Sequence, residues 1–247
     1  MRGTRLDERV VALGLADSRT LAQALIRAGR VLVDDTPVDK PGTRVADAAT
    51  VRVRGEVRRY VSRGGEKLAG ALEDLALDPA GVRALDLGAS TGGFTDCLLQ
   101  QGALHVTAVD VGYGQLAMKL RQDPRVAVVE RTNARNLEAS HLPGPVDLVV
   151  VDVSFISSTL VLAPLTTLCP RAEWLVMVKP QFEVGREQVG KGGVVRDDAV
   201  RAEAVAKVAA FAAECGWHEV GRAESRLAGP KGNREVFLRL RPAEETP

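Results

Sequence analysis

The apolar residues between positions 82 and 180 fall into short β-rich runs, which helical stretches or loops separate. The runs are "RALDLG", "HVTAVDVG", "VAVVE", "VDLVVVDVSF" and "WLVMVKP". Short, almost continuous apolar strands joined by crossovers are typical of a parallel sheet that is covered on both faces. A helix with Leu68, Leu72 and Leu75 on one side precedes the first run. The pattern predicts an α/β fold with a mostly parallel sheet and helices on both faces.

The residues before position 60 have a different pattern. "RLDERVVALGLA" has helical apolar spacing, and "DSRTLAQALIRAG" predicts a second helix, which Asp17 or Ser18 can cap and Gly29 can end. "RVLVDDTPVDKPGTRV" and "ATVRVRG" alternate and carry turn residues, as short strands do. Two helices followed by a small sheet predict a separate α+β unit.

These patterns divide the chain into four parts. We expect a small α+β domain over 1–59, a connector over 60–64 and the α/β domain over 65–242. The last residues, 243–247, are expected to form a disordered tail. A chain of 247 residues is long enough for one large domain and one small one.

The positive charges are unevenly distributed. The first 67 residues contain 14 Lys and Arg against 9 Asp and Glu, and the remainder contains 19 against 23. This excess indicates a module that binds a polyanion, although a solvated charged face explains it equally well.

Several classes of protein are disfavoured by composition. No run of about 18 apolar residues is present, and charges interrupt the first 20 residues, so neither a membrane span nor a signal peptide is expected. Cys97, Cys169 and Cys215 form no CxxC pair and the three histidines are scattered, which predicts free thiols, a cytoplasmic protein and no metal site. The absence of a long exposed apolar stripe predicts a monomer.

A turn of small residues, "DLGASTGGF", ends the first predicted strand. Gly88, Gly92 and Gly93 form GxxxGG, and Ser90 stands where a dinucleotide fingerprint has its second glycine, so a pyrophosphate ligand is disfavoured. Asp110 lies about 22 residues after Gly88, the offset at which an acid meets ribose hydroxyls. S-adenosylmethionine, an adenosine with an amino acid in place of phosphates, suits this pattern. The alternative is a plain packing turn in which Asp110 caps a loop.

Charged residues stand at the ends of later strands. Asp152 ends "VDLVVVDVSF", Lys179 ends "WLVMVKPQF", and Glu235 lies at the mouth of a late strand. Lys67 lies on the helix before the first strand. Each alone is most often a surface charge, but a lysine directly after "LVMV" is hard to explain as one.

The amino-terminal part resembles the S4 domain, a small RNA-binding fold. "RLDERV", "SRTLAQALIRAGRVLVD" and the "KPG" turn carry this resemblance over residues 4–60. It implies that basic side chains contact RNA phosphates. The residues expected to do so are Arg5, Arg19, Arg27 and Arg30, together with Arg63 in the connector.

The remainder of the chain resembles the FtsJ-like RNA 2′-O-methyltransferases in "SRGGEKL", "DLGASTGGF", "VDVSF", "VKPQFEVGRE" and "GNREVFL". With the S4-like part, it is similar to the TlyA (hemolysin A) family of ribosomal RNA methyltransferases. The resemblance implies a Rossmann-like methyltransferase domain and a catalytic tetrad of Lys67, Asp152, Lys179 and Glu235. S-adenosylmethionine is the implied cofactor, and its expected contacts are Asp86, Gly88, Ala89, Ser90, Gly92, Gly93, Phe94, Asp110, Val111, Asn133 and Asp152.

The resemblance implies methylation of cytidine 2′-hydroxyls in the RNA of one or both ribosomal subunits. Lys179 is expected to deprotonate or steer the hydroxyl, while Asp152 and Glu235 hold the lysines. The glycine-rich, charged segment 182–198 is expected to be a mobile lid over the RNA. The alternatives are a non-catalytic RNA-binding assembly factor, a methyltransferase of another RNA and, least favoured, a membrane-active hemolysin.

Overall fold

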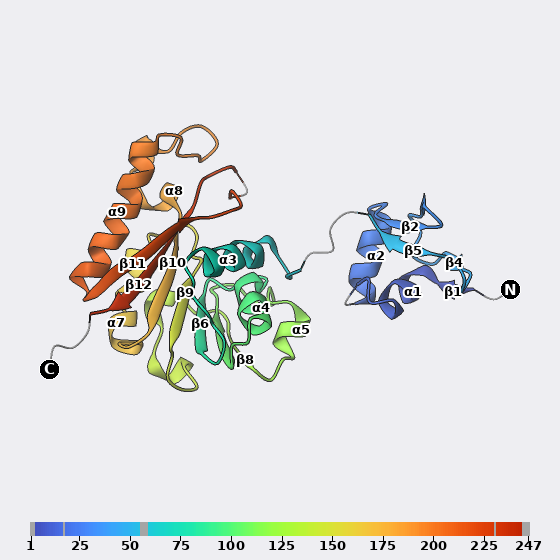
Figure 1. Cartoon of the computed structure of the whole chain (residues 1–247), viewed down its shortest axis with the longest axis horizontal. Coiled ribbons are helices and arrows are strands. Elements are labelled where there is room, and N and C mark those ends of the chain that lie inside the picture. Colours follow the sequence, from blue (N-terminus) through green and yellow to red (C-terminus); the bar gives the residue numbers. More distant parts are fainter. Residues whose placement is uncertain (1–2, 17, 55–58, 230, 244–247) are drawn as a thin grey trace. The chain divides into compact units, whose positions relative to one another are not determined.

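The computed structural model describes residues 3–16, 18–54, 59–229 and 231–243 (Figure 1). Contacts within the chain divide it into two compact units, residues 1–58 and residues 59–247. Each unit is described by itself. Asp17, one of the two predicted helix caps, and the tail beyond Ala243 lie outside the described residues.

The small unit has two helices and short strands, as predicted. Helices α1 (Leu6–Ala12) and α2 (Arg19–Arg27) precede an antiparallel sheet of β3 (Thr36–Pro37), β2 (Val31–Val33) and β5 (Val51–Val53). Strands β1 (Thr4–Arg5) and β4 (Arg44–Val45) form a second pair. Ser18 caps α2, since its hydroxyl accepts from the Leu21 N–H at 3.2 Å. The apolar faces of both helices meet the sheet in one core.

The larger unit is built on a seven-stranded sheet with the order β11-β12-β10-β9-β6-β7-β8 (Figure 1). Its strands are β6 (Arg83–Leu87), β7 (His105–Val109), β8 (Val126–Val129), β9 (Leu148–Val151), β10 (Glu173–Val178), β11 (Trp217–Glu224) and β12 (Val236–Pro242). The neighbours from β10 to β8 pair in parallel, whereas β12 is antiparallel to both β10 and β11. The predicted mostly parallel sheet is confirmed.

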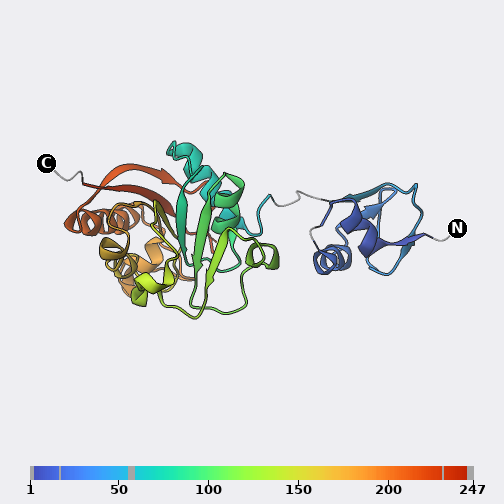
Figure 2. The ribbon, with the colours of Figure 1, turned by 90° about the horizontal axis from the view of Figure 1, so that it is seen from below.

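Helices cover both faces of this sheet (Figure 2). Alternate strand residues point to opposite sides: Ala84 and Val150 pack against α3 (Arg63–Asp74) and α4 (Gly93–Gln100). Leu85 and Val149 pack on the other side, toward α9 (Asp198–Glu214). The remaining short helices are α5 (Met118–Arg121), α6 (Thr159–Leu162), α7 (Leu165–Leu168), α8 (Pro180–Glu183), η1 (Ala134–Asn136), η2 (Ala139–His141) and η3 (Arg186–Gln188).

The predicted connector 60–64 is part of the packed larger unit. Tyr60 is only 2% exposed and belongs to the core beneath α3 and α4. The Val61 N–H donates to Asp96 Oδ2 at 2.8 Å, and α3 begins at Arg63. These contacts tie the segment after residue 59 to α4, the helix that follows the glycine turn.

Among the described residues, no helix is both long and apolar enough to cross a membrane.

Candidate active site

The site is assembled where three neighbouring parallel strands end. Leu87 of β6 is in register with Val109 of β7 and with Val151 of β9, so Gly88, Asp110 and Asp152 emerge side by side. Gly88 has φ 88°, and a Cβ there would lie 2.7 Å from the Asp152 carbonyl oxygen. Only glycine lets the turn pass so close to β9.

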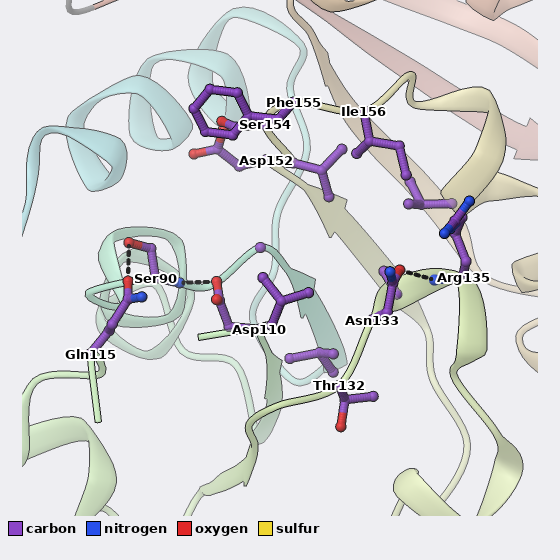
Figure 3. A pocket seen from close by; sticks show the side chains of 16 residues that line it. Ser90, Asp110, Gln115, Thr132, Asn133, Arg135, Asp152, Ser154, Phe155 and Ile156 are labelled. Carbon is purple, nitrogen blue, oxygen red and sulfur yellow. Dashed lines mark hydrogen bonds between the residues drawn. The ribbon is translucent and has the colours of Figure 1, made fainter. Parts of the chain in front are cut away.

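Asp110 connects the glycine turn to the end of β7 (Figure 3). Its Oδ2 accepts from the Ser90 N–H at 2.8 Å, and its Oδ1 accepts from the Gly112 N–H at 2.7 Å. Each carboxylate oxygen has a second lone pair, so Asp110 can still accept from a ligand hydroxyl. The loop-capping role and the ribose-binding role are therefore compatible.

A cavity of about 630 Å³ opens beside this turn (Figure 3). Its volume suits a ligand of nucleoside size. Six of the predicted cofactor contacts line it: Gly88, Ser90, Asp110, Val111, Asn133 and Asp152. Asn133 also caps η1, because its Oδ1 accepts from the Arg135 N–H at 3.0 Å.

The other five predicted cofactor contacts, Asp86, Ala89, Gly92, Gly93 and Phe94, are not among the residues that line this cavity. The Phe94 ring is buried and stacks on Phe237 at 6.1 Å between centroids, because α4 turns it into the core. Gly92 has φ 95° and directly precedes α4. The Phe94 ring therefore packs beneath the turn, and a cofactor contact from this residue stays a prediction.

Some cavity-lining residues escaped sequence reasoning. Ser154, Phe155 and Ile156 follow Asp152, and Thr132 and Arg135 flank Asn133. All lie in motifs already singled out, next to a predicted residue. The sequence places these residues next to predicted site residues, but nothing in it shows that their side chains face the cavity.

Asp86 is completely buried below the turn. Its Oδ2 accepts from the Thr95 hydroxyl at 2.6 Å, and its Oδ1 has no partner among the described residues. Burial raises the pKa of Asp86 to about 7; the Thr95 hydrogen bond counters this, and the nearby charges of Asp152 and Asp110 add to it.

Replacing Asp86 by asparagine should change how stability depends on pH. Because the folded-state pKa is raised above the unfolded value, the wild-type protein loses stability as pH rises from about 4 to about 7. Asparagine does not titrate. We therefore expect the stability of Asp86→Asn, relative to wild type, to increase over this range in urea unfolding at pH 5, 6, 7 and 8. A pH-independent difference would contradict the prediction.

The four predicted tetrad residues form two ion pairs that lie near each other. Lys179 pairs with the Asp152 carboxylate and Lys67 with the Glu235 carboxylate. Lys67, Lys179 and Glu235 are 7%, 8% and 2% exposed. Burial raises the pKa of Asp152, and Lys179 and Lys67 both counter this effect. All three other members therefore lie close enough to Asp152 to act on its charge.

Strand register explains this convergence. Lys179 follows β10, and β12 runs antiparallel to it with Val178 opposite Val236, which places Glu235 across from Lys179. Lys67 reaches Glu235 from α3. Lys67, Lys179 and Glu235 are buried, and burying charged groups is costly compared with burying apolar side chains. Of the four residues Asp152 lines the cavity, whereas Lys67, Lys179 and Glu235 are not among its lining residues. Charged groups clustered at the edge of a cavity indicate a functional role.

The predicted lid, residues 182–198, has defined contacts. Glu183 is buried and accepts from the Ser158 N–H at 2.7 Å, and Gly190 forms a bridge with Val194. Asn233, two residues before Glu235, accepts from the Val195 N–H at 3.0 Å and donates to the Gly193 carbonyl at 2.8 Å. The segment is therefore linked to the residues just before β12, which include Glu235, the partner of Lys67. The mobility of the segment over RNA stays a prediction.

The predicted RNA-binding arginines differ in their surroundings. Arg5 and Arg19 both donate to the buried carboxylate of Asp7 at 3.0 Å. The Arg5 hydrogen bond contributes most to holding the pKa of Asp7 well below its usual range. Arg30 donates to the Arg54 carbonyl at 3.1 Å, and Arg63 to the Ala228 carbonyl at 2.9 Å, whereas Arg27 is exposed.

S-adenosylmethionine-dependent methyltransferases share with dinucleotide-binding domains a mostly parallel sheet, a glycine turn and an acid at the next strand end. The comparisons with known proteins assign this chain to the methyltransferases. A model of the FtsJ-like methyltransferases matches residues 60–241, and one of the S4 domain matches residues 4–51. The chain belongs to the TlyA (hemolysin A) family, which combines these two domains.

Individual relatives match nearly the whole chain. The "16S/23S rRNA (cytidine-2'-O)-methyltransferase TlyA" of Mycobacterium tuberculosis is 54% identical over 97% of this chain and 90% of its own length. "Hemolysin A" of Brachyspira hyodysenteriae is 41% identical over 94% of this chain and 98% of its own length. A solved structure described as a hemolysin, from Streptococcus thermophilus, has a TM-score of 0.75 at 39% identity and covers 99% of this chain and 90% of that one.

Proposed function

We propose that the protein transfers a methyl group from S-adenosylmethionine to the 2′-hydroxyl of cytidine in 16S and 23S ribosomal RNA. The observation that carries this proposal is the set of two lysine–carboxylate ion pairs, one of which includes Asp152 on the wall of the nucleoside-sized cavity. The name of the M. tuberculosis relative supports the choice of cytidine and of both RNAs.

The cavity fits S-adenosylmethionine. Asp110 suits the ribose hydroxyls, and the apolar side chains of Val109, Val111 and Ile156 suit the faces of an adenine ring. The absence of a Cβ at Gly88 lets the turn lie close to the backbone of Asp152, and both residues line the cavity. When bound, the cofactor supplies a methyl group on a positively charged sulfur, which a nucleophilic oxygen can attack.

Lys179 is the residue that we assign to the ribose hydroxyl. In the described part of the chain its Nζ contacts three oxygen acceptors: the Asp152 carboxylate, the Ser154 hydroxyl at 2.9 Å and the Asp152 carbonyl at 3.4 Å. In these surroundings a protonated Lys179 steers the hydroxyl and stabilises negative charge on its oxygen. A neutral Lys179 would instead accept the hydroxyl proton. Lys67 and Glu235 add a second, balanced charge pair that holds the geometry.

Phe155 supplies an apolar surface next to this group. Its side chain is 90% exposed, has a backbone φ of 66° and contacts Phe182 at 5.3 Å between ring centroids. An exposed aromatic ring beside the reacting group can stack on an unpaired base. The exposed ring supports a target nucleotide that lies outside a duplex.

Methyl transfer from labelled S-adenosylmethionine to isolated small and large subunits tests the proposal, with naked rRNA as the comparison. Label in alkali-resistant dinucleotides whose 5′ nucleotide is cytidine would support it and identify the subunit. Label in another RNA alone would favour that RNA as substrate. Binding of subunits and cofactor without transfer would favour a non-catalytic assembly factor.

A separate prediction concerns RNA binding by the arginines of the small unit. Arg27→Ala should weaken RNA binding and reduce the slope of affinity against salt by about 1, with unchanged thermal stability, because this exposed side chain acts only through RNA phosphates. Arg19→Ala should also lower thermal stability, because it removes a partner of buried Asp7. Fluorescence anisotropy at several salt concentrations and thermal unfolding measure both effects. An unchanged salt slope in Arg27→Ala would remove this residue from the interface.

A further inference from the structure

Among the residues that the structure describes, Ser154 is the one side chain besides Asp152 that holds Lys179. Its hydroxyl accepts from Lys179 Nζ at 2.9 Å, and the residue is exposed on the wall of the cavity (Figure 3). We propose that Ser154 is a positioning residue for Lys179, which fixes the direction in which the lysine meets the ribose hydroxyl. The inference rests on the proposed function.

The number of contacts at Nζ supports this role. A lysine ammonium is a compact charge on a flexible four-carbon stem and has three N–H donors. The ion pair with the Asp152 carboxylate leaves Nζ free to rotate, whereas a second acceptor at Ser154 fixes two of its donors. The third contact, to the Asp152 carbonyl, is long at 3.4 Å. The N–H in this weakest contact is the donor that Lys179 can most easily redirect to an incoming hydroxyl oxygen.

The loop that carries Ser154 is held at both ends. It leaves β9 at Asp152, and beyond Phe155 it is fixed by Glu183, which accepts from the Ser158 N–H at 2.7 Å and from the Ser157 hydroxyl at 2.5 Å. Glu183 is buried and lies four residues after Lys179, so one segment carries both the lysine and the anchor of the loop. Phe155, with φ 66°, needs such support, because a non-glycine residue is strained in this region.

Three variants test the inference: Ser154→Ala, Ser154→Thr and, as a control, Ser140→Ala at an exposed serine of η2. In single-turnover methyl transfer with saturating RNA and cofactor, we expect Ser154→Ala to be slower by about 10- to 100-fold, the loss that a misplaced reacting group causes. Ser154→Thr retains the hydroxyl and should recover to within about threefold of wild type. Calorimetric affinity for S-adenosylmethionine, the KM for RNA and the thermal midpoint should stay at wild-type values in all three variants.

The outcomes separate this inference from the proposed function. A wild-type rate in Ser154→Ala, or a Thr variant as slow as the Ala variant, would overturn the positioning role while methyl transfer by the wild type stands. A loss of cofactor affinity equal to the loss of rate would assign Ser154 to cofactor binding instead. If the wild-type protein transfers no methyl group to any RNA offered, the proposed function fails and the inference fails with it.

Discussion

Lys179→Ala is expected to lower the rate of methyl transfer by about 10²- to 10⁴-fold, the range found when a group that handles a proton is removed. Lys179 is 8% exposed and is the cation paired with Asp152 beside the cavity. The loss should appear in kcat and equally in kcat/KM, because the contact forms with the reacting hydroxyl. Single-turnover transfer with labelled cofactor, together with calorimetric binding of S-adenosylmethionine, measures this.

Lys179→Arg is the matched control, because arginine keeps the charge but cannot lose a proton near neutral pH. If Lys179 only steers the hydroxyl, Arg should retain part of the rate. If it accepts the proton, Arg should be as inactive as Ala. Wild-type rates in both variants would exclude Lys179 from the reaction.

Glu235→Ala is expected to lower the free energy of unfolding by about 3–5 kcal/mol, because it leaves the buried ammonium of Lys67 without its partner. Glu235 is 2% exposed and Lys67 is 7% exposed, so water cannot replace the lost carboxylate without rearrangement. Urea unfolding of the full chain, fitted for the larger unit, measures the loss.

The double variant Lys67→Met/Glu235→Leu separates stability from catalysis. Removing both charges together should recover most of the lost stability, because apolar side chains of similar size tolerate burial well. Methyl transfer should nevertheless stay far below the wild-type rate. A double variant that is stable and fully active would show that this pair has only a structural role. If Glu235→Ala lowers the free energy of unfolding by less than about 1 kcal/mol, the pair is well hydrated.

Local patterns were sufficient for much of the fold. Ser18 caps α2 as one of two predicted caps, and the apolar runs from "RALDLG" to "WLVMVKP" form the five parallel strands. Capping and strand formation depend on residues within a few positions of each other, and these interactions are visible in sequence. The order of neighbouring strands and the antiparallel β11–β12 hairpin depend on distant pairing, and no local pattern encodes that.

The residue types of the site could also be read from sequence. Asp110, Asp152 and Lys179 each follow an apolar strand, and the ends of parallel strands share one edge of a sheet. Resemblance added the roles of Lys67 and Glu235. Their contact joins residues 168 positions apart, and only the tertiary fold brings α3, which carries Lys67, to Glu235 directly before β12.

By itself, then, the sequence determined the two kinds of fold, the glycine turn and the set of charged residues, because each depends on local spacing or on motifs. Tertiary structure alone decided which carboxylate pairs with which lysine, because the pairs that form, Lys179 with Asp152 and Lys67 with Glu235, join residues of different strand ends and of α3. It also buried Asp86 and Phe94 beneath the turn and brought Ser154 to Lys179. Burial and hydrogen-bond distance arise from contacts between distant segments, and these exist only in the folded chain.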